Sequence, residues 1–281
     1  MLVKEKMIKN TNKEVNRRII LNTIMFILMM LVNLIADFIS LNGVKATQIL
    51  SINPALFSPA NYTYFIWSFI FIALGAFTIY QYKAFNGKNK KLGNLIMDIS
   101  IFFVISAIGE IGWVFALRWN NIPLTIVHLI FIIVALIITY TRINNSDLPK
   151  KDELFLKTPF SIYFAWVTSM FLVNMSVWLE NIGWTGCSIS EQTWTILATL
   201  LLFIIGVTIT YVFNDFAYGL TVLWALVGIL VKHISKSGFA GQYIWIIACL
   251  AISIILMSFI IVRILYRNKI FEVFSARKAD I

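Results

Sequence analysis

The sequence predicts an all-α protein that crosses a membrane eight times. Of its 281 residues, 60% are apolar and only 13% are charged. Apolar runs of about 20 residues, long enough for a helix to cross roughly 30 Å of hydrocarbon, recur along the whole chain. The polar segments between these runs span at most about 20 residues, whereas a soluble domain needs roughly 50 or more. The sequence therefore indicates a polytopic membrane protein with no soluble domain.

The apolar runs place the expected spans in order along the chain. The first run follows a lysine-rich leader, and no small-residue cleavage site comes after it, so we expect an uncleaved signal anchor. The sixth and seventh runs are separated by a few residues that include Asn214, Asp215 and Gly219, whose turn chemistry predicts a tight helical hairpin. The eight spans are expected at residues 19–41, 60–82, 93–115, 122–141, 158–179, 194–213, 216–232 and 241–265.

The distribution of basic residues predicts the orientation of the chain in the membrane. With eight spans, all of the 23 lysines and arginines except Lys45, Arg118, Lys232 and Lys236 fall on the side that holds both termini. Cytoplasmic loops carry such an excess, so we expect cytoplasmic termini, in a bacterial cytoplasmic membrane. Topology and contact with anionic lipids then account for the net charge of +10, and nucleic acid is not an expected partner.

Three ionisable residues in the outer halves of the spans are candidates for function. The sequence has no phosphate-cradling glycine loop, metal-spaced His/Cys group or nucleophile elbow, so neither a metal nor a covalent cofactor is expected. Asp37 lies near the outer end of the first span, Glu110 in the third and His128 in the fourth. Glu110 and His128 are expected to reach similar depth on antiparallel neighbours, where they could pair. A charge at that depth is costly unless it is paired or faces a cavity. The pair could tie two helices, or lie beside a ligand or a proton path.

Three motifs occur in order along the first five spans. The first opens the second span, the second joins the third and fourth spans, and the third has the pattern W-x7-N-x3-W-x2-N on the fifth span. Their residues are Pro54, Ser58, Pro59, Trp67 and Gly75, then Trp113 and Pro123, then Trp166, Asn174, Trp178 and Asn181. In type, spacing and order these motifs resemble those of the TspO/MBR family, the tryptophan-rich sensory or translocator proteins.

The resemblance implies a five-helix bundle with a pocket below the loop that joins the first two spans. Residues 19–185 would form this bundle, after a basic cytoplasmic leader at 1–18. Residues 186–265 would add three transmembrane helices, which the motifs do not reach, and 266–281 would form a cytoplasmic tail. The loop 42–58 would be a lid, hinged where two prolines hold the chain extended and start the next helix. The resemblance implies a ligand site made of Pro54, Pro59, Trp67, Trp113, Trp166, Asn174 and Trp178.

The aromatic residues of this region have two interpretations. Tyr62 and Tyr64 lie where a loop becomes a helix and are expected to anchor the chain at the membrane interface. Trp67 and Trp166 lie several residues inside their spans, and a buried indole N–H needs a partner. Each could simply pack against a neighbouring helix. Alternatively, they line a cavity for a flat apolar ligand, as the resemblance implies.

The leading functional hypothesis is a membrane protein that binds flat hydrophobic ligands for sensing or transport. The resemblance implies porphyrins or haem-like tetrapyrroles, and also lipids or sterols, with the bilayer as the other partner and a homodimer left open. A second hypothesis is an enzyme that degrades porphyrin in light with its pocket tryptophans. A third is a secondary transporter that uses the Glu110–His128 pair. A fourth is a structural or sensory partner whose last three spans contact another membrane protein.

Overall fold

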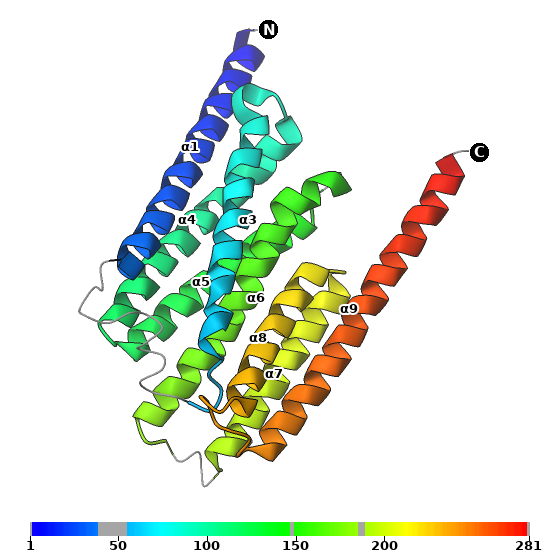
Figure 1. Ribbon diagram of the computed structural model, residues 1–281. Helices are drawn as coiled ribbons and strands as arrows, with labels where there is room; N and C mark the ends of the chain where they lie inside the picture. The colour runs from blue at the N-terminus through cyan, green and yellow to red at the C-terminus, as the bar shows by residue number, and fades with distance from the viewer. Residues whose placement is uncertain (1, 39–54, 147–148, 185–188, 280–281) are drawn as a thin grey trace. The chain divides into compact units, whose positions relative to one another are not determined.

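The computed structural model describes residues 2–38, 55–146, 149–184 and 189–279, which form long helices (Figure 1). Helix makes up 87% of the structure, and the described residues contain no strand. Eight helices are long and apolar enough to cross a membrane, which confirms the expected number of spans. These are Thr11–Ala36, Asn61–Gly87, Lys90–Arg118, Ile122–Asn144, Leu154–Asn181, Glu191–Val212, Phe216–Ile234 and Ile244–Arg267.

The first and last helices are longer than their apolar runs. Helix α1 covers Leu2–Phe38, so it includes nearly all of the expected leader. Helix α9 covers Ile244–Ala279 and includes most of the expected tail. Both extensions are polar, and neither contains a proline or glycine that would end a helix. The helices therefore continue beyond the hydrocarbon-length segments from which their spans were predicted.

The chain forms two compact units. The N-terminal unit contains residues 1–54 and 64–178, and the C-terminal unit contains residues 55–63 and 179–281. The expected division at residues 185 and 186 placed residues 55–63 with the first five helices. In the structure, the contacts of this short segment group it with the last three helices instead.

Five helices form the N-terminal unit. Helix α4 packs against both α1 and α5, and aromatic rings on α6 complete the core. Phe160 of α6 is fully buried, with its ring centroid 4.9 Å from that of Phe77 on α3 and 6.0 Å from that of Phe103 on α4. Besides α1, the helices are α3 (Ile66–Tyr80), α4 (Lys90–Arg118), α5 (Ile122–Asn144) and α6 (Lys150–Asn181).

A polar contact inside the apolar core fixes α1 against its neighbours. Asn22 is fully buried, and its side-chain amide donates hydrogen bonds to Gln81 Oε1 at 2.9 Å and to Ser100 Oγ at 3.0 Å. Hydrophobic burial does not drive helices together in lipid, so hydrogen bonds between helices and close packing hold them in register. Asn22 thus aligns α1 with both the end of the second span and α4.

The second span ends in a shaped turn. The 3₁₀ helix η3 covers Gln81–Gly87, and its last two residues have positive φ values of 57° at Asn86 and 73° at Gly87. Asn16 of α1 holds the turn, because its amide nitrogen donates to Asn86 Oδ1 at 2.7 Å and its oxygen accepts from Asn86 N–H at 2.8 Å. Asn89 then caps α4 by accepting from Leu92 N–H at 3.1 Å. This turn fixes the path of the loop between α3 and α4.

Three helices that contact one another pairwise form most of the C-terminal unit. Helix α7 covers Glu191–Val212, α8 covers Phe216–Ile234, and α9 packs against both. The expected hairpin is confirmed, because Asn214 has a φ of 52° and Asp215 Oδ1 caps α8 by accepting from Ala217 N–H at 3.0 Å. At Gly206, a Cβ atom would come within 2.8 Å of Val222, so the missing side chain lets α7 and α8 approach closely.

Residues 55–63, which we call the docked segment, bind to α7 and α8. The two backbone groups of Leu56 are both used: its N–H donates to Glu191 Oε1 at 3.1 Å, and its carbonyl accepts from His233 Nε2 at 2.8 Å. Ala60 N–H donates to the Gly228 carbonyl at 2.9 Å, and Trp224 Nε1 donates to the Thr63 carbonyl at 2.9 Å. These bonds satisfy backbone polar groups of the docked segment that would otherwise be buried without partners.

Candidate functional site

Three helices of the N-terminal unit bring aromatic side chains together. Trp67 lies in the first turn of α3, with its ring centroid 5.8 Å from that of Trp113 on α4 and 6.1 Å from that of Tyr163 on α6. Trp113 is 5% exposed and Tyr163 is fully buried, whereas Trp67 is half-buried. Trp67 and Trp113, predicted from separate motifs, are therefore direct neighbours.

Trp166, a third tryptophan predicted from the motifs, extends this group of rings. Trp166 is fully buried on α6, three residues after Tyr163, which places both on one face of the helix. The Tyr64 ring packs edge-on against Trp166, with centroids 5.9 Å apart and planes at 83°. We call Tyr64, Trp67, Trp113, Tyr163 and Trp166 the aromatic cluster.

Three polar atoms of the aromatic cluster are buried without a hydrogen-bond partner among the described residues. They are the indole nitrogens of Trp113 and Trp166 and the hydroxyl of Tyr64. The burial of this hydroxyl contradicts the interfacial anchoring expected for Tyr64, because an anchor needs its polar end in the headgroup region. Tyr62 is 44% exposed, which is compatible with anchoring. Each buried group of this kind costs about 1–3 kcal/mol relative to a satisfied one.

The carboxyl group of Glu110 lies one helical turn before Trp113 and is fully buried. One of its oxygens, Oε1, accepts a hydrogen bond from Asn33 Nδ2 of α1 at 2.6 Å. The other oxygen is buried and has no partner in the part of the chain that the structure describes. Oε2 of Glu110 is therefore a fourth unsatisfied polar atom. Glu110 lies on the same face of α4 as Trp113.

The possible Glu110–His128 pair is not seen among the described hydrogen bonds: Oε1 of Glu110 bonds to Asn33, and Oε2 has no described partner. His128 is half-buried on α5, and its ring lies against α4 at Gly112, where an added Cβ would be 2.6 Å from the His128 Nδ1 atom. Positions two residues apart on a helix point in nearly opposite directions. The face of α4 that meets His128 is thus not the face that carries Glu110. The two residues were correctly expected on adjacent helices, but their rotation about the helix axes was not predictable from depth.

Asn174 has a role in helix packing. It is fully buried, its oxygen accepts from the Thr125 hydroxyl of α5 at 2.8 Å, and its nitrogen donates to the Met170 carbonyl at 2.8 Å. This contact ties α6 to α5 and engages both ends of the amide. A role of Asn174 in ligand binding stays a prediction, since a ligand would have to compete with these bonds.

The remaining predicted residues lie outside the aromatic cluster or outside the described part. Trp178 is half-buried on α6, 12 residues after Trp166, which is about 18 Å along the helix. Pro59 is buried in the docked segment of the C-terminal unit. Asp37 belongs to the last turn of α1, and its side chain is not described. Pro54 and most of the expected lid, residues 42–54, lie outside the described residues, whereas 55–58 belong to the docked segment.

Sequence reasoning assigned Tyr64 to interfacial anchoring and missed two further residues of this site. Asn33 is the partner of Glu110, and Tyr163 joins Trp67 to α6. The signal for Asn33 was a lone amide in the apolar first span, because a polar side chain there needs a partner on another helix. Tyr163 could have been found from its spacing, since it precedes Trp166 by three residues on a helix.

Eight apolar helices define this chain as an integral membrane protein. A model of the TSPO-like protein family matches residues 19–262, so the chain belongs to this family. The match also covers the three C-terminal helices, which the sequence motifs did not reach. Comparison with curated proteins and with solved structures gave no match.

Proposed function

We propose that the protein binds a flat hydrophobic ligand of tetrapyrrole type at the aromatic cluster. The observation that carries the proposal is the group of polar atoms that have no partner in the described part of the chain and lie among tilted and edge-on aromatic rings: Trp113 Nε1, Trp166 Nε1, Tyr64 OH and Glu110 Oε2. Membership of the TSPO-like family supports the same class of ligand, through the resemblance of its motifs.

The chemistry of the aromatic cluster suits a flat ring with polar substituents. Contact with an aromatic side chain contributes about 0.5–1.5 kcal/mol beyond the burial of area. The two indole N–H groups can donate to carboxylate oxygens such as the propionates of a porphyrin. A ligand that supplies these acceptors removes the cost of about 1–3 kcal/mol for each unsatisfied donor. Rings and donors therefore favour the same kind of molecule.

Titration with protoporphyrin IX tests the proposal. The purified protein is titrated in detergent, and binding is followed by the Soret absorbance of the porphyrin, which does not depend on the number of tryptophans. Trp113→Phe and Trp166→Phe keep an aromatic ring but remove one N–H donor each. We expect each to weaken binding by about two- to twelvefold, the equivalent of one hydrogen bond of about 0.5–1.5 kcal/mol.

Trp119→Phe provides the matched control for this titration. Trp119 lies at the end of α4 in the same unit, but it is 57% exposed and contacts Phe115. Its replacement should leave the affinity unchanged. Absence of saturable binding in the wild type would refute the tetrapyrrole proposal, and equal affinities in all three variants would move the site away from the aromatic cluster.

No observation favours the alternative functions. The transporter hypothesis depended on a Glu110–His128 pair, and Glu110 bonds to Asn33 instead. Degradation of porphyrin in light would use the same tryptophans as binding, so it can be tested only on porphyrin that is already bound. The titration answers it when the Soret absorbance of the complex is also followed under illumination.

We also propose that both termini face the cytoplasm of a bacterial cell. The basic residues support this orientation, as argued from the sequence. A single cysteine is introduced by Ile281→Cys in a background that carries Cys187→Ser and Cys249→Ser. We expect a membrane-impermeant maleimide to label it only after the cells are permeabilised. Labelling in intact cells would reverse the proposed orientation of the C-terminus.

A further inference from the structure

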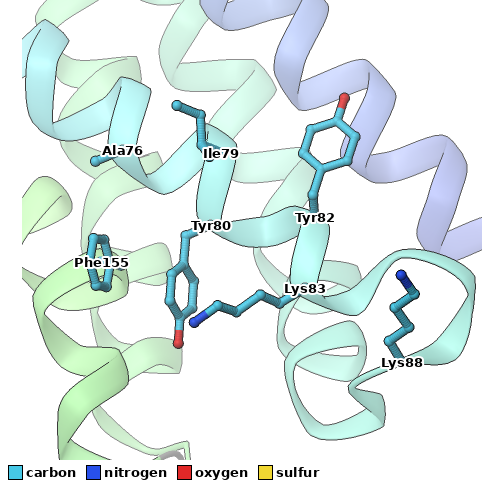
Figure 2. Close-up of a pocket in the computed structure, with 7 residues that line it drawn as sticks. All are labelled: Ala76, Ile79, Tyr80, Tyr82, Lys83, Lys88 and Phe155. Atoms are coloured by element: carbon cyan, nitrogen blue, oxygen red, sulfur yellow. The ribbon is translucent and has the colours of Figure 1, made fainter.

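We propose that the end of the second span carries a binding site for the headgroup of an anionic phospholipid. The site is an open cavity of about 720 Å³ in the N-terminal unit (Figure 2). It lies about 20 Å along α3 from Trp67, at the other end of the helix, so this proposal is independent of the aromatic cluster. Its lining residues are Ala76, Ile79, Tyr80, Tyr82, Lys83 and Lys88, with Phe155 from α6.

A rigid aromatic floor supports this cavity. The rings of Tyr80 and Phe155 are stacked, with centroids 4.7 Å apart and planes at 7°. Tyr80 is 7% exposed, and its hydroxyl donates a hydrogen bond to the buried carboxylate of Asp152. This bond fixes the ring and occupies the acidic side chain next to the cavity. The floor thus keeps its shape without a ligand.

Two lysines give the cavity its charge. Lys83 Nζ lies 4.1 Å from the centroid of the Tyr80 ring, a cation–π contact that holds the ammonium group over the floor. Lys88 follows the turn at Asn86 and Gly87, which the paired amides of Asn16 and Asn86 hold in place. In Figure 2, Lys83 extends toward Tyr80 and Lys88 stands on the turn to its right, both below Tyr82 in this view. Among the residues whose side chains are described, the lining carries two positive charges and no carboxylate.

The apolar wall of the cavity selects a lipid rather than a soluble anion. Ile79 lines the cavity and is 76% exposed, and Ile72, two turns earlier on α3, is 70% exposed. In a membrane-spanning helix such side chains face acyl chains. A phospholipid could place its phosphate between Lys83 and Lys88 and lay an acyl chain along this face. Basic pockets at the ends of membrane helices recognise anionic headgroups in this way.

Native mass spectrometry of the detergent-solubilised protein tests the site. Phosphatidylglycerol is titrated into the wild type and into the double variant Lys83→Gln/Lys88→Gln, and the apparent Kd of the first bound lipid is measured. We expect the double variant to bind phosphatidylglycerol roughly tenfold more weakly, because two charges near the phosphate are lost. Binding of the neutral lipid phosphatidylcholine should not change.

Two further variants separate a local site from a general effect of charge. Lys13 and Lys90 are exposed in the same unit, and neither lines the cavity. Lys13→Gln/Lys90→Gln should therefore keep the wild-type Kd, and an equal loss in this variant would overturn the proposal. Lys83→Arg/Lys88→Arg keeps both charges and should restore binding, and failure to do so would also overturn it.

Inorganic phosphate serves as the competitor that distinguishes the source of the anion. We expect millimolar phosphate to leave the bound phosphatidylglycerol in place, because phosphate gains nothing from the apolar wall. Displacement by phosphate at that concentration would assign the cavity to a soluble anion and refute the lipid site. Neither result changes the outcome expected for the porphyrin titration, so each proposal can be refuted without the other.

Discussion

Replacement of Asn33 by leucine is expected to destabilise the protein by about 2–3 kcal/mol, although Asn33 is one amide on a lipid-facing helix. Asn33 Nδ2 donates to Glu110 Oε1 at 2.6 Å, and the other oxygen of Glu110 is buried with no partner in the described ranges of the chain. Without Asn33, neither oxygen of a fully buried carboxyl group would have a partner. The cost of an unsatisfied buried acceptor is about 1–3 kcal/mol and rises when the group is charged.

Replacement of the partner, Glu110, by leucine should destabilise the protein much less than replacement of Asn33. In Glu110→Leu, the Asn33 amide keeps its hydrogen bond to the Met29 carbonyl, which it makes at 3.0 Å. Replacing both partners by apolar side chains can be nearly neutral, so the double variant Asn33→Leu/Glu110→Leu should be about as stable as Glu110→Leu alone. The wild type, the two single variants and the double variant form a double-mutant cycle. Reversible titration with sodium dodecyl sulfate measures their free energies of unfolding. Equal losses in the two single variants would contradict this account of the site.

The number of spans was predictable because it depends on a local property of the chain. A run of about 20 apolar residues crosses the hydrocarbon whatever it packs against. The hairpin between α7 and α8 was predictable for the same reason, since Asp215 caps the helix that it precedes. Both signals are present within a few residues of the structure that they specify.

The docked segment was not predictable from local signals. The sequence placed residues 55–58 in a lid and Pro59 in a ligand site of the first five helices. In the structure, Leu56 bonds to Glu191 and His233, which lie 135 and 177 residues further along the chain. No periodicity or turn signal near Leu56 points to those partners. The segment belongs to the C-terminal unit because its backbone groups find acceptors and donors there.

Several aromatic residues of the candidate site were predicted from the sequence, but the hydrogen-bond partner of Glu110 was not. Trp67, Trp113 and Trp166 were assigned from motif spacing, and the structure places Trp67 and Trp113 side by side. The partner of Glu110 was expected on α5, because depth along the span was the only coordinate that the sequence supplied. The direction of a side chain around its helix depends on how the helices are rotated in the bundle. That rotation turns Glu110 to Asn33 and leaves Gly112 facing His128.

The Gly228→Ala substitution is expected to detach the docked segment and destabilise the C-terminal unit by about 1–3 kcal/mol. A Cβ atom at Gly228 would lie 2.6 Å from Cγ2 and 2.9 Å from Cβ of Thr63, with the hydroxyl oxygen nearer still. Gly228 also accepts the bond from Ala60 N–H at 2.9 Å, so the backbones cannot separate without losing it. The overlap should outweigh the gain of about 1 kcal/mol that alanine brings to a helix.

Gly93→Ala is the matched control for this prediction, and its expected effect on stability has the opposite sign. Gly93 lies in α4, and a Cβ there would meet Val15 at 3.5 Å, an ordinary contact. Only the gain in helix propensity then applies, so this variant should be as stable as the wild type or more stable. Unfolding titrations measure both variants, and maleimide labelling of Ser58→Cys in the Cys187→Ser/Cys249→Ser background reports detachment, because Ser58 is buried while the segment is docked. Thr63→Ala should restore part of the stability of Gly228→Ala, because it removes two of the overlapping atoms. Equal stability and equal labelling in the two glycine variants would mean that the docked segment is not held by its close approach to α8.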